Sequence, residues 1–243
     1  MKLFLIAQKD LLKLRKYDFP FLFVYGVTIP LIKQTVMKLI YTLVILSSGI
    51  SAFGQKDRPA EDVHASLLTG KKRSLIAYAE KDHSFTLEVA ARQAKPSDVP
   101  GFINIDHQIV QSTLVPVDQS INVNAVTTDR EKVILGKYMN YELEYYKKKL
   151  REDYSHLQTE WVTLRGRLFL VWYYDMPKNN QLVNRQIYVS TLFFDQVMDL
   201  NAPVFKAQDF DKAKGILLRL AASMKTYDKQ LDLTALARKL NKE

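Results

Sequence analysis

The order in which β-type and helix-type stretches follow one another constrains the fold of this chain most strongly. From Arg73 to Phe205, short runs rich in Val, Ile, Thr, Tyr and Phe are joined by polar loops, and one long helical pattern interrupts them. A second helical pattern follows the last run. Strands joined by short loops pair antiparallel, and amphipathic helices must cover the sheet that they form. The sequence therefore predicts an α+β domain over residues 73–228, with a largely antiparallel sheet covered by helices.

The strands of this sheet are expected where β-type residues run between turn signals. Residues 73–79 and 84–90 should form a hairpin across a charged turn, and residues 95–101 should form a loop. Gly166 predicts a turn or a bulge inside one long β-type stretch. The remaining extended segments are predicted at residues 102–116, 120–127, 158–174, 185–195 and 196–205.

Helices are expected at two places in the domain, at one place after it and at one place before it. Thr128 and Glu131 fit a capping box, and tyrosines then recur at helical spacing on one apolar face. Asp209 should cap a second helix. Residues 232–240 should form a third helix, within a C-terminal helix or tail at 229–243. A lead-in segment at 55–72 is predicted to contain a short helix at 60–68.

The first 54 residues are predicted to lie outside the fold. Met37 and Lys38 make a short basic start, residues 39–46 are apolar, and small residues lead to Gly54. This order is typical of a secretory signal peptide at 37–54, cleaved between Gly54 and Gln55. Residues 1–36 are then a mis-assigned extension upstream of the true start. A genuine long leader, or a retained membrane anchor, is the alternative. The favoured interpretation predicts a periplasmic or secreted protein that contacts the membrane only in transit.

Composition excludes several classes of function. The chain of 243 residues has no Cys, so disulfides, thiolate catalysis and Cys-ligated metals are excluded. Seven of its 35 basic residues and two of its 26 acidic residues lie in the first 54, which leaves the remainder a net charge of +4. Such a mild excess argues against a nucleic-acid partner, because domains that bind nucleic acid concentrate a stronger positive field.

The motifs of common enzyme classes are missing from the sequence. The five glycines after residue 54 are never close together, so neither a phosphate-binding loop nor a dinucleotide fingerprint is present. None of the four histidines lies three or four residues from another. We therefore expect no cofactor, no metal and no catalytic residue. A dispersed site remains the alternative, because catalytic groups need not be neighbours in the chain. His107 and His156 would be its first suspects.

Aromatic and basic residues supply the candidate binding residues. Tyrosines of the first helix precede a basic helix end, and a Trp-Tyr-Tyr run lies on a predicted strand. Aromatic rings beside cations can stack on ligands and hold anionic groups. The helical spacing of the tyrosines favours a core role instead. Neighbouring residues of a strand face opposite sides, so the run must either face a second layer or form an exposed patch. The candidates are Lys147, Lys148, Lys149, Arg151, Trp172 and Tyr174.

The C-terminal half of the chain resembles the ending of PsbP-like domains. Residues 184–205, followed by residues 209–228, are similar to the hairpin, turn and final helix of those domains. Residues 84–90 and the loop to Phe102 resemble their first hairpin. The resemblance covers about residues 75–227 and implies an αβ sandwich. Members of this family are mostly binding or assembly proteins, and no catalytic motif is shared that could assign a residue.

These observations favour an exported, non-enzymatic binding or assembly module with a protein or envelope partner. Two alternatives stay open. One is an envelope hydrolase with a dispersed His and carboxylate site. The other is a binder of anionic glycan or lipid surfaces, which would use the basic helix end at residues 147–151.

Overall fold

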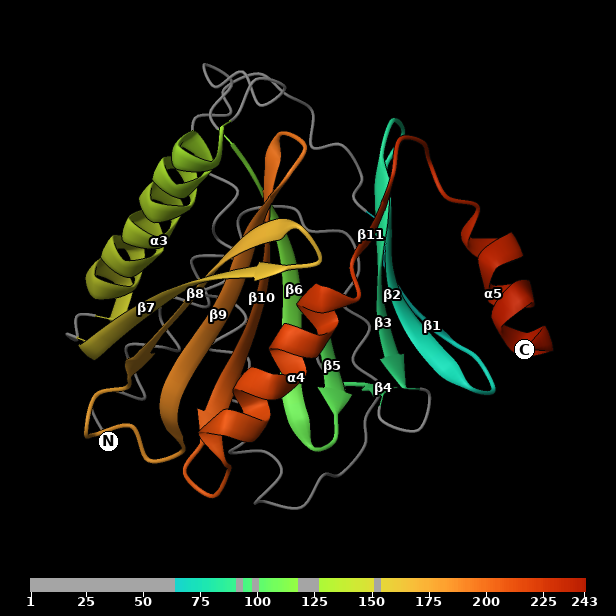
Figure 1. Cartoon of the computed structure of the whole chain (residues 1–243). Helices are drawn as coiled ribbons and strands as arrows, with labels where there is room; N and C mark the ends of the chain where they lie inside the picture. The colour runs from blue at the N-terminus through green and yellow to red at the C-terminus, as the bar shows by residue number, and fades with distance from the viewer. Residues whose placement is uncertain (1–63, 91–93, 98–100, 118–126, 151–153) are drawn as a thin grey trace, which may run out of the picture. The chain divides into compact units, whose positions relative to one another are not determined.

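A computed structural model describes residues 64–90, 94–97, 101–117, 127–150 and 154–243. Within these ranges the chain forms two antiparallel sheets and three helices (Figure 1). The predicted α+β class, with antiparallel sheets covered by helices, is confirmed. The predicted strand at 120–127 lies mostly outside the described residues.

The smaller sheet has the strand order β1-β2-β3-β11. The predicted hairpin is confirmed residue for residue, because Arg73 pairs with Ala90 and Ala79 pairs with Ser84. The predicted helix at 60–68 is wrong from residue 64 onward, where the chain forms a strand that pairs with β2. The strands are β1 (His64–Thr69), β2 (Arg73–Ala79), β3 (Ser84–Ala90) and β11 (Lys225–Tyr227).

The larger sheet has the strand order β4-β5-β6-β10-β9-β8-β7. Each neighbouring pair is antiparallel, as expected for strands linked by short turns. Its strands are β4 (Ala94–Pro96), β5 (Phe102–Ile105), β6 (Gln108–Pro116), β7 (Ser155–Leu164), β8 (Arg167–Asp175), β9 (Val183–Phe193) and β10 (Gln196–Phe205).

Two tight turns divide stretches that the sequence presents as continuous. Arg165 and Gly166 have φ of 51° and 81°, so the predicted strand at 158–174 is a hairpin that turns at Gly166. Asp106 and His107 have φ of 49° and 67° and divide residues 102–116 in the same way. Left-handed backbone at both central residues matches the twist of paired strands, which explains these two-residue turns.

The helices are α3 (Thr128–Leu150), α4 (Phe210–Ala222) and α5 (Leu233–Lys242). The predicted cap of α4 is confirmed, since Asp209 accepts hydrogen bonds from the first-turn backbone N–H groups, and Asp232 caps α5 in the same way. The cap of α3 lies one residue earlier than predicted. The Thr127 hydroxyl accepts a bond from the backbone N–H of Arg130, and its carbonyl accepts one from Glu131.

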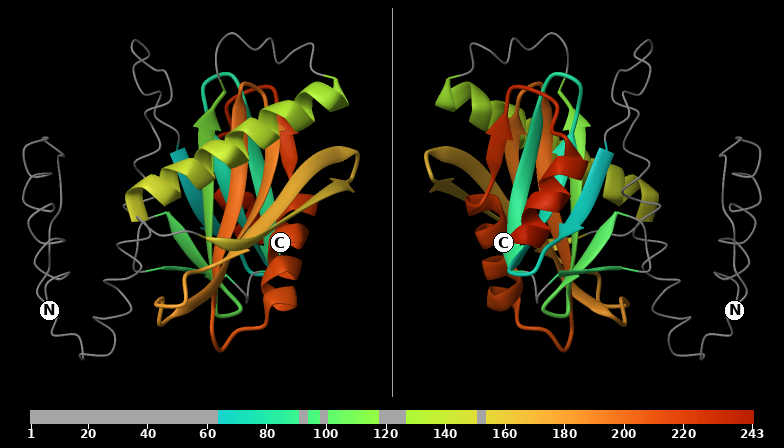
Figure 2. Two further views of the ribbon diagram at one scale, coloured as in Figure 1. Left: turned by 90° about the vertical axis from the view of Figure 1, so that its left-hand side faces the viewer. Right: turned by 90° about the vertical axis from the view of Figure 1, so that its right-hand side faces the viewer.

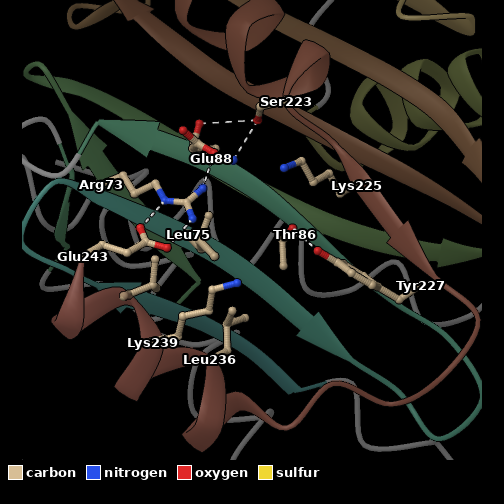
Figure 3. A pocket seen from close by; sticks show the side chains of 11 residues that line it. Arg73, Leu75, Thr86, Glu88, Ser223, Lys225, Tyr227, Leu236, Lys239 and Glu243 are labelled. Atoms are coloured by element: carbon tan, nitrogen blue, oxygen red, sulfur yellow. Dashed lines mark hydrogen bonds and ion pairs between the residues drawn. The ribbon is translucent and has the colours of Figure 1, made fainter.

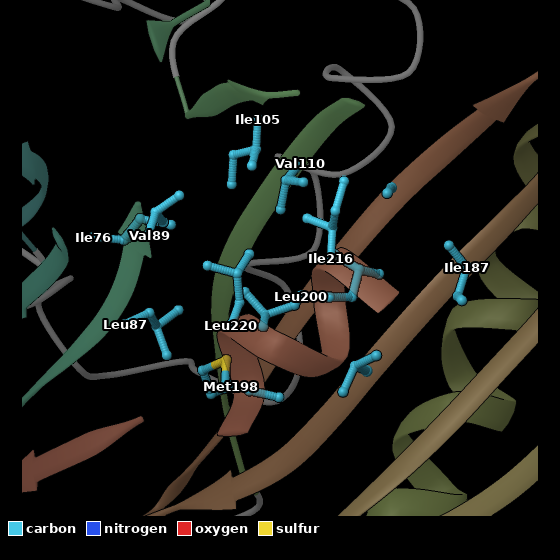
Figure 4. Close-up of a cluster of buried hydrophobic side chains, with 14 of the residues drawn as sticks. Ile76, Leu87, Val89, Ile105, Val110, Ile187, Met198, Leu200, Ile216 and Leu220 are labelled. Atoms are coloured by element: carbon cyan, nitrogen blue, oxygen red, sulfur yellow. The ribbon is translucent and has the colours of Figure 1, made fainter. Parts of the chain in front are cut away.

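Two hydrophobic cores hold the layers together. One joins α4 to both sheets and includes Leu87, Leu200 and Leu220 (Figure 4). The other lies between α3 and the opposite face of the larger sheet and includes Leu135 and Trp172. Side chains of β8 and β9 alternate between these two cores. Helix α3 crosses its face of the sheet diagonally (Figure 2). Both faces of the larger sheet are therefore covered.

Candidate binding groove

The outer face of the smaller sheet is only partly covered by a helix. Alternation along β2 and β3 sends Ile76 and Leu87 into the core beneath α4, which leaves Arg73, Leu75 and Glu88 on the other face. Helix α5 packs against β1 and β2 on this face. The part of the face formed by β3 and β11 lies beside the helix. A groove runs between this part of the sheet and α5 (Figure 3).

A close contact between Leu240 and Gly70 anchors α5 beside the groove. Leu240 is its one buried residue. A Cβ atom at Gly70 would lie 2.7 Å from the carbonyl oxygen of Leu240 and 2.8 Å from its Cβ atom, so only glycine allows the helix to approach this closely. The helix therefore has a fixed position that defines one wall of the groove.

Arg73 lines the groove and binds two carboxylates. Its Nε and Nη2 atoms donate to the two carboxylate oxygens of Glu243, both at 2.8 Å. Its Nη1 atom donates to Glu88 Oε2 at 2.7 Å. These bonds raise the pKa of Arg73 and lower that of Glu243, so both of these groups are charged at neutral pH. The guanidinium therefore presents the two-pronged geometry that recognises a carboxylate.

Further cations surround this point. An inner hollow of about 120 Å³ is lined by residues of β2, β3, β11 and α5, including Lys225 and Lys239. A wider hollow of about 500 Å³ shares Arg73, Glu88 and Lys225 with it and adds Lys72 and Arg165. Five cationic side chains and two carboxylates thus line the two hollows. Within the part of the chain that the structure describes, Lys225 and Lys239 form no ion pair.

This arrangement suits an anionic, extended ligand. Leu75 supplies an apolar floor, and Leu236 and Leu240 add apolar surface from the α5 wall. Thr86 and Tyr227 supply hydroxyl groups, and the cations surround them. The Thr86 and Tyr227 hydroxyls lie 3.4 Å apart. A carboxylate entering the groove would meet a positive field from several directions, which raises both its encounter rate and its affinity.

A second unusual site lies buried beneath α3. Trp172 Nε1 donates to Ser190 Oγ at 3.1 Å, and Ser190 Oγ donates to Asp199 Oδ1 at 2.5 Å. Asn201 Nδ2 donates to Asp199 Oδ2 at 3.3 Å. Glu142 reaches this layer from α3 and is 1% exposed. Its Oε1 atom has no hydrogen-bond partner among the described residues. A row of polar groups thus replaces the apolar contacts expected between a helix and a sheet.

Burial keeps the two acids of this layer protonated to unusually high pH. Removal from water, together with the smaller effect of the nearby charge of Asp199, raises the pKa of Glu142 to about 8. Burial likewise raises the pKa of Asp199 to about 7, against the opposing effect of hydrogen bonds from Ser190 and Asn201. The layer therefore gains negative charge at mildly alkaline pH.

The aromatic candidates belong to this buried layer. Trp172 and Tyr174 are 0% and 3% exposed, and Trp172 stacks on Tyr188 with ring centroids 3.7 Å apart. Tyr173 points to the other face of the sheet and packs against Phe210. The strand aromatics therefore face two covering layers, and the core interpretation of the buried α3 residue Tyr138 is confirmed. Buried rings cannot contact a ligand at the surface.

The basic candidates lie at the far end of α3. Lys147 and Lys148 are exposed there, whereas Trp172 and Tyr174 are buried. The side chain of Lys149 lies outside what the structure describes, as do Arg151 and the predicted cleavage site at Gly54 and Gln55. Binding by Lys147 and Lys148 stays a prediction.

Two histidines have carboxylate partners. His83 Nε2 lies 2.5 Å from Glu80 Oε2, and His83 stacks on Phe194. His156 Nδ1 lies 3.0 Å from Asp175 Oδ2, but its side chain is 78% exposed. Neither pair lines the two hollows of the groove. His107, the other suspect, lies in the turn between β5 and β6. Among the described residues, no cluster of three or more His, Asp or Glu side chains could hold a metal ion.

Sequence reasoning missed the groove, because its residues come from five separate segments. Arg73 and Glu243 are 170 positions apart. One signal was available: the third helix pattern has its leucines on one side, and this side had to cover some part of the sheet. The buried acid also had a signal, because Glu142 occupies the row of Leu135, Tyr138 and Tyr146 where helical spacing requires an apolar residue.

Comparison with known proteins yields a resemblance of fold alone. No family model matches the chain, and no curated protein matches it in sequence. Among solved structures, the solution structure of cyanobacterial PsbP from Synechocystis is similar to it, with 12% sequence identity and a TM-score of 0.42. The match covers 72% of this chain and all of the other. It agrees with the weak PsbP-like resemblance seen in the sequence and contributes nothing to the functional argument.

No helix in the described part of the chain is long and apolar enough to cross a membrane.

Proposed function

We propose that this chain is a non-enzymatic binding module whose groove takes an acidic segment of a protein partner. The observation that carries the proposal is the Arg73 fork, which already binds carboxylates at 2.7–2.8 Å inside a groove with an excess of cations. An extended peptide suits the site, because the groove runs along the strands of an open sheet face and combines an apolar floor with charged walls.

The partner is proposed to be met outside the cytoplasm. Support comes from the predicted signal peptide at residues 37–54, with cleavage after Gly54. Mass spectrometry of the exported protein tests this part separately. A mature N-terminus at Gln55 is expected, and a chain that keeps residue 1 and stays with membranes after an alkaline wash would contradict it.

Binding is tested with the full chain and a rhodamine-labelled hexaglutamate peptide. Fluorescence anisotropy should show saturable binding that weakens steeply as salt rises from 25 to about 300 mM, because screening shortens the reach of exposed charges to about 10 Å near 0.1 M. A hexaglutamine peptide of the same length should not bind. This comparison separates recognition of charge from adhesion to an apolar floor.

Variants locate the binding in the groove. Lys225→Gln should lower the affinity about two- to fivefold, because it removes one exposed charge that faces the ligand. Lys212→Gln is the matched control, since it changes the net charge equally at an exposed position of α4 that lines neither hollow. Equal effects of the two variants, or binding that salt leaves unchanged, would refute the groove as the site.

A further inference from the structure

Glu243 has an unusual charge for its position in the fold. It follows α5 directly as the C-cap residue, where the helix dipole presents its negative end. A carboxylate is the unfavourable sign at this position, whereas Lys239 and Lys242 in the same turn have the favourable one. The placement is explained by Arg73, to which both oxygens of Glu243 are bound.

The contact has the geometry of a ligand bound to a receptor. Both carboxylate oxygens of Glu243 accept from one edge of the guanidinium, whereas Glu88 takes only one bond from the remaining nitrogen. An incoming carboxylate that forms two parallel bonds to Nε and Nη2 must therefore displace Glu243. Glu88, on β3, accepts only from Nη1 and does not occupy the Nε and Nη2 atoms.

We propose that Glu243 is an internal competitor that occupies the carboxylate position of the groove until an acidic partner displaces it. This inference rests on the proposed function and adds its regulation. The partner's carboxylate takes over the two bonds to Arg73, and Glu243 moves into solvent. No hydrogen bond of α5 has to break for this exchange, because only the side chain of Glu243 moves and its backbone N–H keeps its bond to the Lys239 carbonyl oxygen.

Displacement of Glu243 from Arg73 costs little free energy for two reasons. The side chains of Arg73 and Glu243 are 30% and 29% exposed, so the released carboxylate is readily hydrated. Helix α5 remains anchored by Leu240 against Gly70, three residues before Glu243. The helix can therefore keep its place while the side chain of Glu243 moves, and Lys239 stays beside the incoming acid.

The test measures hexaglutamate affinity of the full chain and of Glu243→Gln by fluorescence anisotropy at low salt. The affinity of Glu243→Gln should be about two- to fivefold higher, because an exposed ion pair no longer competes. Glu144→Gln is the control with the same change of net charge. Glu144 is exposed on α3, on the far side of the larger sheet from α4, and should leave the affinity unchanged.

A second background separates competition from simple repulsion between acids. In Arg73→Gln there is no fork to compete for, so the gain from Glu243→Gln should fall to the level of the control. An equal gain in both backgrounds, or no gain from Glu243→Gln while Lys225→Gln still weakens binding, overturns the inference and leaves the proposed function standing. If hexaglutamate binds neither the natural chain nor Glu243→Gln, the proposed function itself fails.

Discussion

The buried acid beneath α3 makes the stability of this protein depend on pH in a defined direction. Glu142 keeps its proton in the folded chain up to a pKa of about 8, whereas the unfolded chain releases it near the ordinary value of 4.5. Between these values the folded state binds more protons than the unfolded state, so the free energy of unfolding falls as pH rises. Glu142→Gln removes this dependence, because an amide has no proton to lose.

The size of the effect follows from the difference between the two pKa values. Each unit of pKa difference corresponds to about 1.4 kcal/mol, so the natural chain should lose up to roughly 5 kcal/mol through Glu142 between pH 4.5 and pH 8. Above pH 8 the loss levels off. Glu142→Gln should match the natural chain near pH 4.5 and exceed its stability by up to roughly that amount at pH 9. Such a difference is a large share of the total stability of a domain.

Urea unfolding monitored by circular dichroism in steps from pH 5 to pH 9 measures this directly. Glu144→Gln is the matched control, since Glu144 lies two residues away on the exposed side of α3 and should follow the natural chain. Asp199 adds a second loss of the same sign, because its pKa of about 7 also lies above the ordinary value of 3.8. A natural chain equally stable at pH 5 and pH 9, or a Glu142→Gln curve parallel to it, would refute the reasoning.

Other substitutions test the turns, the helix contact and the polar layer. Gly166→Ala should cost about 1–2 kcal/mol, because its φ of 81° disfavours a side chain, whereas Gly136→Ala in α3 should stabilise by about 0.5–1 kcal/mol; thermal unfolding compares the two. Gly70→Ala should cost about 1–3 kcal/mol, since its Cβ atom would overlap Leu240, and faster proteolysis within α5 would report the loosened helix. Ser190→Ala should cost about 1–3 kcal/mol and change the near-ultraviolet dichroism of its indole partner.

Much of the fold could be predicted because its signals are local. Asp209 and Asp232 each cap a helix through side-chain bonds to residues two or three positions away. The β2–β3 hairpin follows from two β-type runs and the charged turn between them. The sequence does not decide whether Gly166 forms a turn or a bulge, because a glycine permits both. The sequence does not predict the strand at 64–69, because this strand depends on pairing with β2 and its own residues carry no β-type pattern that indicates the pairing.

The buried polar layer beneath α3 could not be predicted to the same degree, and β10 shows why. Along this strand Asp199 and Asn201 alternate with Met198 and Leu200, a pattern that normally indicates one face in water. In the structure both faces are buried, because α3 covers the polar side. Alternation reports polarity and leaves open whether water or a second layer lies opposite. Here a second layer lies opposite, because α3 covers this face. Its buried row contains Glu142, so polar groups of the helix and the sheet face each other. The polar residues of β10 and the acid on the apolar face of α3 thus belong to one buried polar layer, and the pH dependence of unfolding measures its effect on stability.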